Sequence, residues 1–307
     1  MIQPLPTDRE DIAAADNPLG IDGVEFIEYT TARPQALGQV LEAMGFRPVA
    51  RHRSREVLLY RQGGVNVIVN AHVNAHASGA PRGAPPSDRP VISALALRVR
   101  DAAFALRSVL DRGAWAVPTR VEVMELNIPA IHGVGTSRVY FVDRWREFSI
   151  YDVDFVPIPG AEARPAALAG FSFYGVVQYI GAFRMEDWTE FYAELFGFRV
   201  LPDEVRHGIL PKGRVLQSPC GGFFLQLVEP EPGQLDIEGD ESLHRLGLST
   251  HDVPSAVAVL RRRGVDFVES ASVRPDERGA LTAPRLGASM FELVHHVAAA
   301  GEDGCRS

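Results

Sequence analysis

The chain has 307 residues, of which 46% are hydrophobic and 23% are charged, so disordered and fibrous proteins are excluded and roughly two packed units are expected. Its 31 Lys and Arg against 39 Asp and Glu give a net charge of −8, which argues against general attraction to nucleic acid or to an anionic membrane. A small molecule is therefore the expected partner, and a homo-oligomer is an open option.

Cysteine use and hydropathy indicate the compartment. The two cysteines, Cys220 and Cys305, are too few for a disulfide framework or a Cys-rich zinc site. Residues 1–20 carry acidic groups where a secretory leader would be basic, and no apolar run is long enough to span a bilayer. We therefore expect a flexible lead over 1–20 and a soluble, cytoplasmic protein.

Four helices are predicted in chain order, and they repeat at a fixed spacing. Amphipathic stretches lie over 34–44, 102–112, about 188–195 and 255–263, and each ends at a glycine that suits a left-handed helix stop: Gly45, Gly113, Gly197 and Gly264. The first and third of these glycines are 152 residues apart (197 − 45), and the second and fourth are 151 apart (264 − 113). This spacing indicates a duplicated pair of modules.

Short β-rich runs surround each predicted helix. They precede it at 24–29, 92–99, 173–180 and 246–250, and follow it at 65–69, 139–142, 223–228 and 291–297. The fold class is therefore α+β, with four βαβββ modules paired into two open eight-stranded barrels. The predicted boundaries are a first barrel at 21–156 (modules 21–74 and 91–156), a linker at 157–169, a second barrel at 170–298 (modules 170–232 and 241–298) and a tail at 299–307.

Local sequence in the first half resembles one family of the vicinal oxygen chelate superfamily, the 4-hydroxyphenylpyruvate dioxygenases. The matching segments are NPLG at 17–20, FIE at 26–28, MGF at 44–46, RHRS at 51–54, LYRQ at 59–62, ELNIPAI at 125–131 and SIYDVDF at 149–155. The resemblance is strong over 17–156 and weaker over 169–297. It implies that the first barrel is structural and that the second holds Fe(II) on two histidines and one glutamate.

This sequence departs from that ligand set. In the resemblance, Glu292 keeps the carboxylate position, but Gly175 and Arg245 stand where the two histidines are expected, and neither is an iron ligand here. We therefore expect no cofactor, with Fe(II) implied by the resemblance only, and we expect that Gly175→His with Arg245→His would create metal binding. His244 is adjacent to Arg245 but faces the other side of a regular strand, so only a bulge would make it a substitute.

The remaining side chains suggest a ligand cavity. Arg245 is expected to reach Glu292 across the vacated metal position, with Arg245 as an anion holder and Glu292 as a general base. The other expected lining residues are Gly175, Gln178, Gln226, Phe173 and Phe224. Such a cavity would suit a small aromatic or keto-acid ligand.

Three functions stay open at this point. The first is a metal-independent relative of the dioxygenases that binds, isomerises or dehydrates such a ligand. The second is an Fe(II) dioxygenase that uses the shifted ligands His244, Glu292 and His296. The third is a non-catalytic binding or regulatory barrel, for which Arg245 and Glu292 form only a packed salt bridge.

Overall fold

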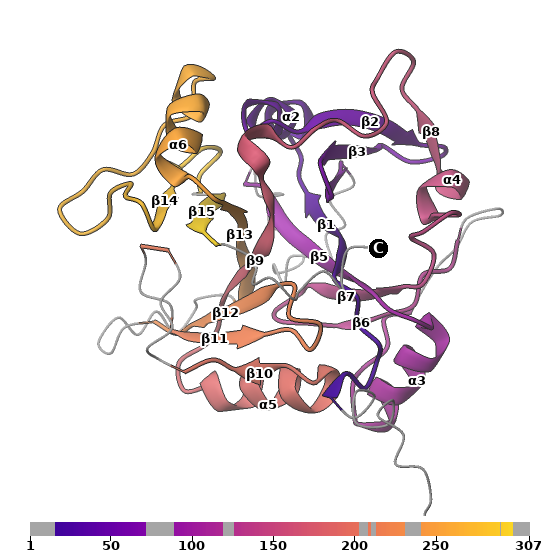
Figure 1. The fold of residues 1–307 in the computed structure, drawn as a ribbon. Coiled ribbons are helices and arrows are strands. Elements are labelled where there is room, and N and C mark those ends of the chain that lie inside the picture. The colour runs from indigo at the N-terminus through magenta and orange to yellow at the C-terminus, as the bar shows by residue number, and fades with distance from the viewer. Residues whose placement is uncertain are drawn as a thin grey trace, which may run out of the picture.

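A computed structural model describes residues 16–71, 89–118, 126–202, 208–209, 213–230, 241–288 and 290–296. It is an α+β fold in which one mixed sheet of fifteen strands runs through the described residues (Figure 1). None of the helices in these ranges combines the length and apolar character that a membrane span needs. Most of the stretch between the first two predicted modules, 75–90, lies outside the described residues, as do the tail at 299–307 and all but residues 16–20 of the predicted lead.

Four long strands form the centre of the sheet, and each opens one of the predicted modules. β1 (Val24–Thr30) pairs antiparallel with β5 (Val91–Arg98), and β9 (Ser172–Tyr179) pairs in the same way with β13 (Ser242–Thr250). A contact between Leu243 and Ile92 joins β13 to β5, so the two halves of the chain share the sheet.

The last strand of each module returns to lie parallel beside its first strand. The parallel pairs are β1 with β4 (Val65–Asn70), β5 with β7 (Arg138–Val142), β9 with β12 (Phe224–Val228) and β13 with β15 (Phe291–His295). The other strands extend the sheet outward and are β2 (Arg47–His52), β3 (Val57–Gln62), β6 (Ala130–His132), β8 (Phe155–Pro157), β10 (Arg199–Val200), β11 (Arg214–Gln217) and β14 (Gly279–Leu281).

The predicted βαβββ order is present in full in the first and third modules. In the second and fourth, the described residues contain two regular strands after the helix. The remaining strand is reduced to single bridges, Ala116 to Ile131 and Phe267 to Thr282, which again lie 151 residues apart (267 − 116). The duplication therefore extends to the irregular parts of the chain.

The four main helices lie where periodicity predicts them, at α2 (Pro34–Ala43), α3 (Ala102–Asp111), α5 (Met185–Phe196) and α6 (Val253–Arg262). Asp101 and Asp252 cap the starts of α3 and α6 by accepting backbone N–H bonds at 2.8 and 2.9 Å. The predicted stop glycines all have positive φ, between 78° and 102°. A shorter helix α4 (Ile150–Asp154) and a 3₁₀ turn η1 (Leu168–Gly170) complete the described set.

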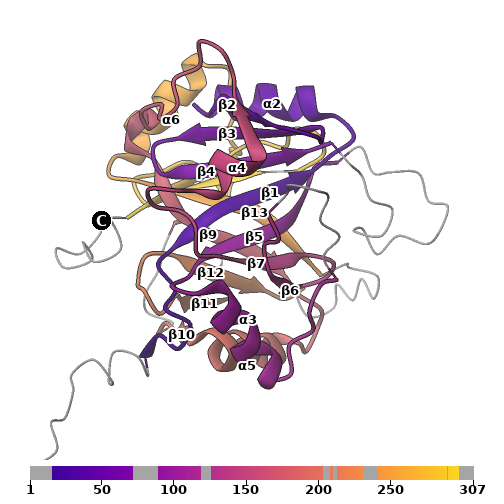
Figure 2. The same ribbon diagram turned by 90° about the vertical axis from the view of Figure 1, so that its right-hand side faces the viewer.

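The helices pair between the halves of the chain, α2 beside α6 and α3 beside α5 (Figure 2). Arg112, just after α3, donates to the carbonyls of Glu194 and Leu195 at the end of α5, at 3.1 and 3.2 Å. Arg263, just after α6, donates to the carbonyls of Glu42 and Ala43 at the end of α2. Each half therefore satisfies free helix-end carbonyls of the other.

The hydrophobic residues divide into one large cluster and two small ones. The large cluster joins the helices to the sheet and spans both halves. The small clusters lie on the opposite sheet face, one around Phe26 and Phe155 and the other around Tyr174 and Phe224. The segment at 157–169, predicted as a linker, is hydrogen-bonded to the first half: the Pro165 carbonyl accepts from Gly63 N at 2.8 Å.

Candidate functional site

Arg245 and Glu292 meet on adjacent parallel strands of the second half. Arg245 Nε lies 3.3 Å from Glu292 Oε2, and the exposed fractions of the two residues are 5% and 0%. The expected ion pair is therefore present in the structure. A buried pair of this kind needs further polar partners, because desolvation costs several kcal/mol per charge.

Tyr179, which sequence reasoning missed, is such a partner. Arg245 Nη1 donates to Tyr179 Oη at 3.2 Å, and Tyr179 is 36% exposed, so a tyrosine connects the buried guanidinium to solvent. His244 stacks on the Tyr179 ring with centroids 4.2 Å apart. Burial, with smaller effects of Arg245 and Arg89, lowers the pKa of His244 to about 4, so this imidazole is neutral near pH 7.

A bulge in β13 explains the position of His244. The register with β9 steps from Leu243 opposite Gln178 to Arg245 opposite Val177, which leaves His244 as the extra residue. The bulge considered from the sequence thus exists. It places His244 against Tyr179, while Arg245 keeps the contact with Glu292.

A second bulge lies in β9 and brings Tyr174 into the site. The register steps from Gly175 opposite Gly247 to Phe173 opposite Leu248, and the extra residue Tyr174 stacks on Phe224 at 4.9 Å. Burial and the nearby Glu292 carboxylate hold the pKa of Tyr174 well above its usual range, and the side chain of the buried Gln226 partly opposes them. Tyr174 was also missed from the sequence, because the bulge breaks strand alternation.

Gly175 lies where β9 and β12 approach closely. A Cβ built on Gly175 would come within 2.0 Å of the carbonyl oxygen of Phe224, far inside contact distance. The histidine that we expected to help create a metal site at Gly175 would therefore require β9 and β12 to separate first.

Two of the residues expected to line the cavity face the other way. Gln178 exchanges hydrogen bonds with the hydroxyl of Tyr192 in α5, at 2.9 and 3.1 Å. Phe173 packs against Phe223 in the large cluster beneath the helices. Alternation on β9 places Gln178, because Val177 opposes Arg245 and its neighbour must point to the opposite face. Phe173 is turned to that face by the bulge at Tyr174.

His296 lies beside the aromatic pair of the site. Its ring is 5.9 Å from that of Tyr174 and 5.7 Å from that of Phe224, edge-on to both. His244, Glu292 and His296 are all described, and no group of three or more His, Cys, Asp or Glu able to hold a metal occurs within the described ranges. His244, Glu292 and His296 therefore do not fit the shifted Fe(II) ligand set that the second function would need.

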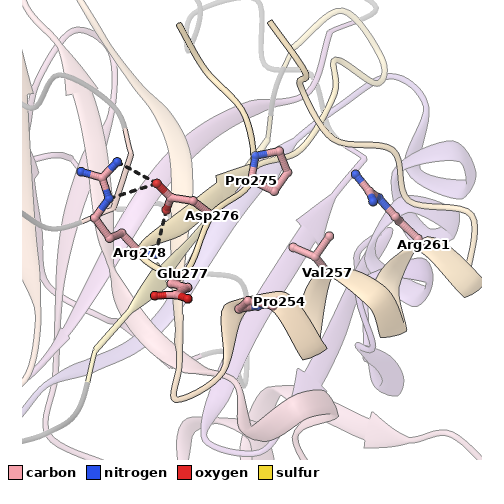
Figure 3. A pocket seen from close by; sticks show the side chains of 7 residues that line it. All are labelled: Pro254, Val257, Arg261, Pro275, Asp276, Glu277 and Arg278. Carbon is pink, nitrogen blue, oxygen red and sulfur yellow. Dashed lines mark hydrogen bonds and ion pairs between the residues drawn. The ribbon is translucent and has the colours of Figure 1, made fainter. Parts of the chain in front are cut away.

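The hollow around α6 is separate from this site. It has a volume of about 530 Å³ and is lined by Pro254, Val257, Arg261, Pro275, Asp276, Glu277 and Arg278 (Figure 3). Asp276 and Arg278 pair with each other there at 2.7 Å, and both lie toward solvent. We assign it no chemistry.

Comparisons with known proteins match two separate stretches of the chain. Residues 15–156 match the family model described as hydroxyphenylpyruvate dioxygenase, N-terminal, and residues 177–284 match the glyoxalase/bleomycin resistance protein/dioxygenase superfamily. A triple mutant of 4-hydroxymandelate synthase from Streptomyces coelicolor shares the fold, with a TM-score of 0.68 at 18% identity, over 90% of this chain and 93% of that one.

Two curated relatives cover most of the chain. Hemolysin VllY of Vibrio vulnificus is 35% identical over 282 residues, which are 86% of this chain and 76% of that protein. The 4-hydroxyphenylpyruvate dioxygenase of Pseudomonas aeruginosa is 32% identical over 267 residues, 83% of this chain and 73% of the enzyme. With the fold, this similarity shows that the chain belongs to the 4-hydroxyphenylpyruvate dioxygenase family of the vicinal oxygen chelate superfamily.

Proposed function

We propose that this protein binds a small aromatic or keto acid in its second half, without the Fe(II) chemistry of its family. The observation that carries the proposal is the buried ion pair of Arg245 and Glu292. A guanidinium beside the glutamate supplies a fixed positive charge where a metal ion would otherwise hold an anionic ligand. Arg245 is the anion holder in this proposal, and Glu292 is the candidate general base.

The surroundings of the pair support an approach for the ligand from the Tyr179 side. Tyr179 is partly exposed and is hydrogen-bonded to Arg245, whereas Glu292 is fully buried. A carboxylate that displaces the Tyr179 hydroxyl would take over its hydrogen bond to Arg245, and a guanidinium can bind a carboxylate through two parallel bonds. The aromatic rings of Tyr174 and Phe224 would form an apolar wall for the rest of the ligand.

Two measurements on the full chain test the proposal. Metal analysis after purification without chelators should find far less than one iron per chain, and phenylpyruvate titrated in a calorimeter should bind with an affinity that Arg245→Gln lowers at least tenfold. Near-stoichiometric iron that Glu292→Ala releases would overturn it in favour of the dioxygenase with shifted ligands. Binding that Arg245→Gln leaves unchanged would remove the ligand role of the pair.

A further inference from the structure

The first half of the chain contains a partly open cavity of its own. Its volume is about 220 Å³, and it lies on the sheet face opposite the helices α2 and α3. We call it the N-terminal cavity. Its lining includes the aromatic residues Phe26 and Phe155 and the polar residues Glu28, Asn70, Arg138 and Tyr140. A space with aromatic walls and a few polar groups is typical of a small-molecule site.

The internal repeat places this cavity at the counterpart of the Arg245 and Glu292 site. In the second half, Glu292 on β15 is the partner of Gly247 on β13. In the first half, Tyr140 on β7 is the partner of Ala96 on β5 in the same parallel arrangement. The two interiors are thus built alike, and they differ in the side chains that they present.

The cavity contains a carboxyl group, Glu28, and a guanidinium, Arg138, on either side of the small residue Ala94. Ala94 on β5 is the partner of Glu28 on β1 and of Arg138 on β7, so all three side chains lie on one face. Two strand spacings, about 10 Å, separate the outer backbones. Both line the cavity and attract each other electrostatically, but no direct salt bridge joins these two described residues.

Neighbouring side chains orient Glu28 and Arg138 and leave both groups able to form further hydrogen bonds. Asn70 Nδ2 donates to Glu28 Oε1 at 2.9 Å, and Arg138 Nη1 donates to Tyr140 Oη at 3.3 Å. Ser93 is a further side-chain partner of Glu28. A carboxylate has about four acceptor positions and a guanidinium has five donors, so these bonds leave capacity on both groups. Burial, opposed by Asn70 and by Arg138, raises the pKa of Glu28, which indicates that water solvates this group poorly.

We propose that the N-terminal cavity binds a single-ring aromatic carboxylate that carries a hydroxyl on the far side of the ring. Arg138 binds the carboxylate, Glu28 bonds the hydroxyl, and the ring lies over Ala94 between Phe26 and Phe155. The volume of the cavity limits the ligand to a single ring, because 220 Å³ is below the range of about 300–1,000 Å³ that holds drug-sized ligands. The proposal does not depend on the function proposed for the second half.

Calorimetric titration of the full chain with three probes tests the ligand chemistry. 4-Hydroxybenzoate should bind, while benzoate, which lacks the hydroxyl, and phenol, which lacks the carboxylate, should each bind at least tenfold more weakly. Failure of 4-hydroxybenzoate to bind the folded wild-type protein would overturn the proposal. Equal affinity for all three probes would overturn it as well.

Variants locate the site. Arg138→Gln should weaken 4-hydroxybenzoate at least tenfold, and Ala94→Leu should abolish binding by filling the gap between the two polar groups. Arg107→Gln makes the same charge change on the exposed face of α3 and should leave the affinity unaltered. If Ala94→Leu does not fold, Arg138→Gln still decides. Binding that survives Arg138→Gln but is lost in Arg245→Gln would place the ligand in the second half and overturn the inference.

Discussion

Arg245 and Glu292 each depend on the other for their burial. Removing one partner would leave the second charge in a site with almost no water, at a cost on the order of 3 kcal/mol of unfolding free energy. We therefore expect Arg245→Ala to destabilise the protein by about that amount, and Arg245→Ala with Glu292→Ala to cost less than the sum of the single changes. Urea denaturation of the wild type, both single variants and the double variant measures this coupling.

The exposed pair of Arg278 and Asp276 is the matched control for that cycle. Their side chains are 65% and 35% exposed, so Arg278→Ala should lower the unfolding free energy far less than Arg245→Ala does. Additive losses at Arg245 and Glu292, like those expected of two surface groups, would contradict the role of the buried pair.

His244 should make stability depend on pH. Its pKa is about 4 in the folded protein and about 6.5 in the unfolded chain, so only the unfolded state takes up the proton between these values. Stability is then fully present above about pH 6.5 and decreases as the pH falls toward 4, by an amount on the order of 2 kcal/mol. His244→Phe keeps a flat ring against Tyr179 and should flatten the decrease in urea midpoints measured over this range. An unchanged pH profile in this variant would assign the decrease to other groups.

At the scale of the strand, the close approach of β9 and β12 can be tested at Gly175. Because a Cβ there would clash with the Phe224 carbonyl, Gly175→Ala should destabilise the protein by roughly 2 kcal/mol or more. Gly64 is the control, since a Cβ there would meet nothing within 4 Å, and Gly64→Ala should change the thermal midpoint little. A well-tolerated Gly175→Ala would show that the two strands can separate at low cost.

The helices and strands were predictable from the sequence, but the direction in which some strand side chains point was not. Amphipathic spacing and stop glycines located all four main helices within a few residues, because both signals are local. The expected directions of two side chains on β9 were wrong. Phe173 faces the helices because the bulge at Tyr174 inserts a residue that the two-residue period does not anticipate, whereas Gln178 follows plain alternation beside Val177. The contact of Arg245 with Glu292 was predictable because the resemblance places both residues at the ligand positions of one metal ion, which must lie close together.

At the scale of the whole molecule, Arg112 and Arg263 join the two halves. Each donates two hydrogen bonds to carbonyls at a helix end, and each such bond contributes about 1 kcal/mol. Arg112→Ala and Arg263→Ala should each lower the unfolding free energy by roughly 1 to 2 kcal/mol, measured by urea denaturation. The losses should be additive, because the sites lie at opposite ends of the shared sheet (Figure 2). Variants as stable as the wild type would show that water replaces these caps at no cost.

The two capping arginines also describe a symmetry. Arg112 and Arg263 are 151 residues apart (263 − 112), and the carbonyls that they bind, at Glu42 and Glu194, are 152 apart (194 − 42). An isologous, two-fold interface is one in which the same groups of the two subunits contact each other reciprocally. The chain is thus arranged like a homodimer whose subunits have been fused. The first half carries both the donor, Arg112, and an acceptor, the end of α2, so two copies of that half have the groups needed to cap each other.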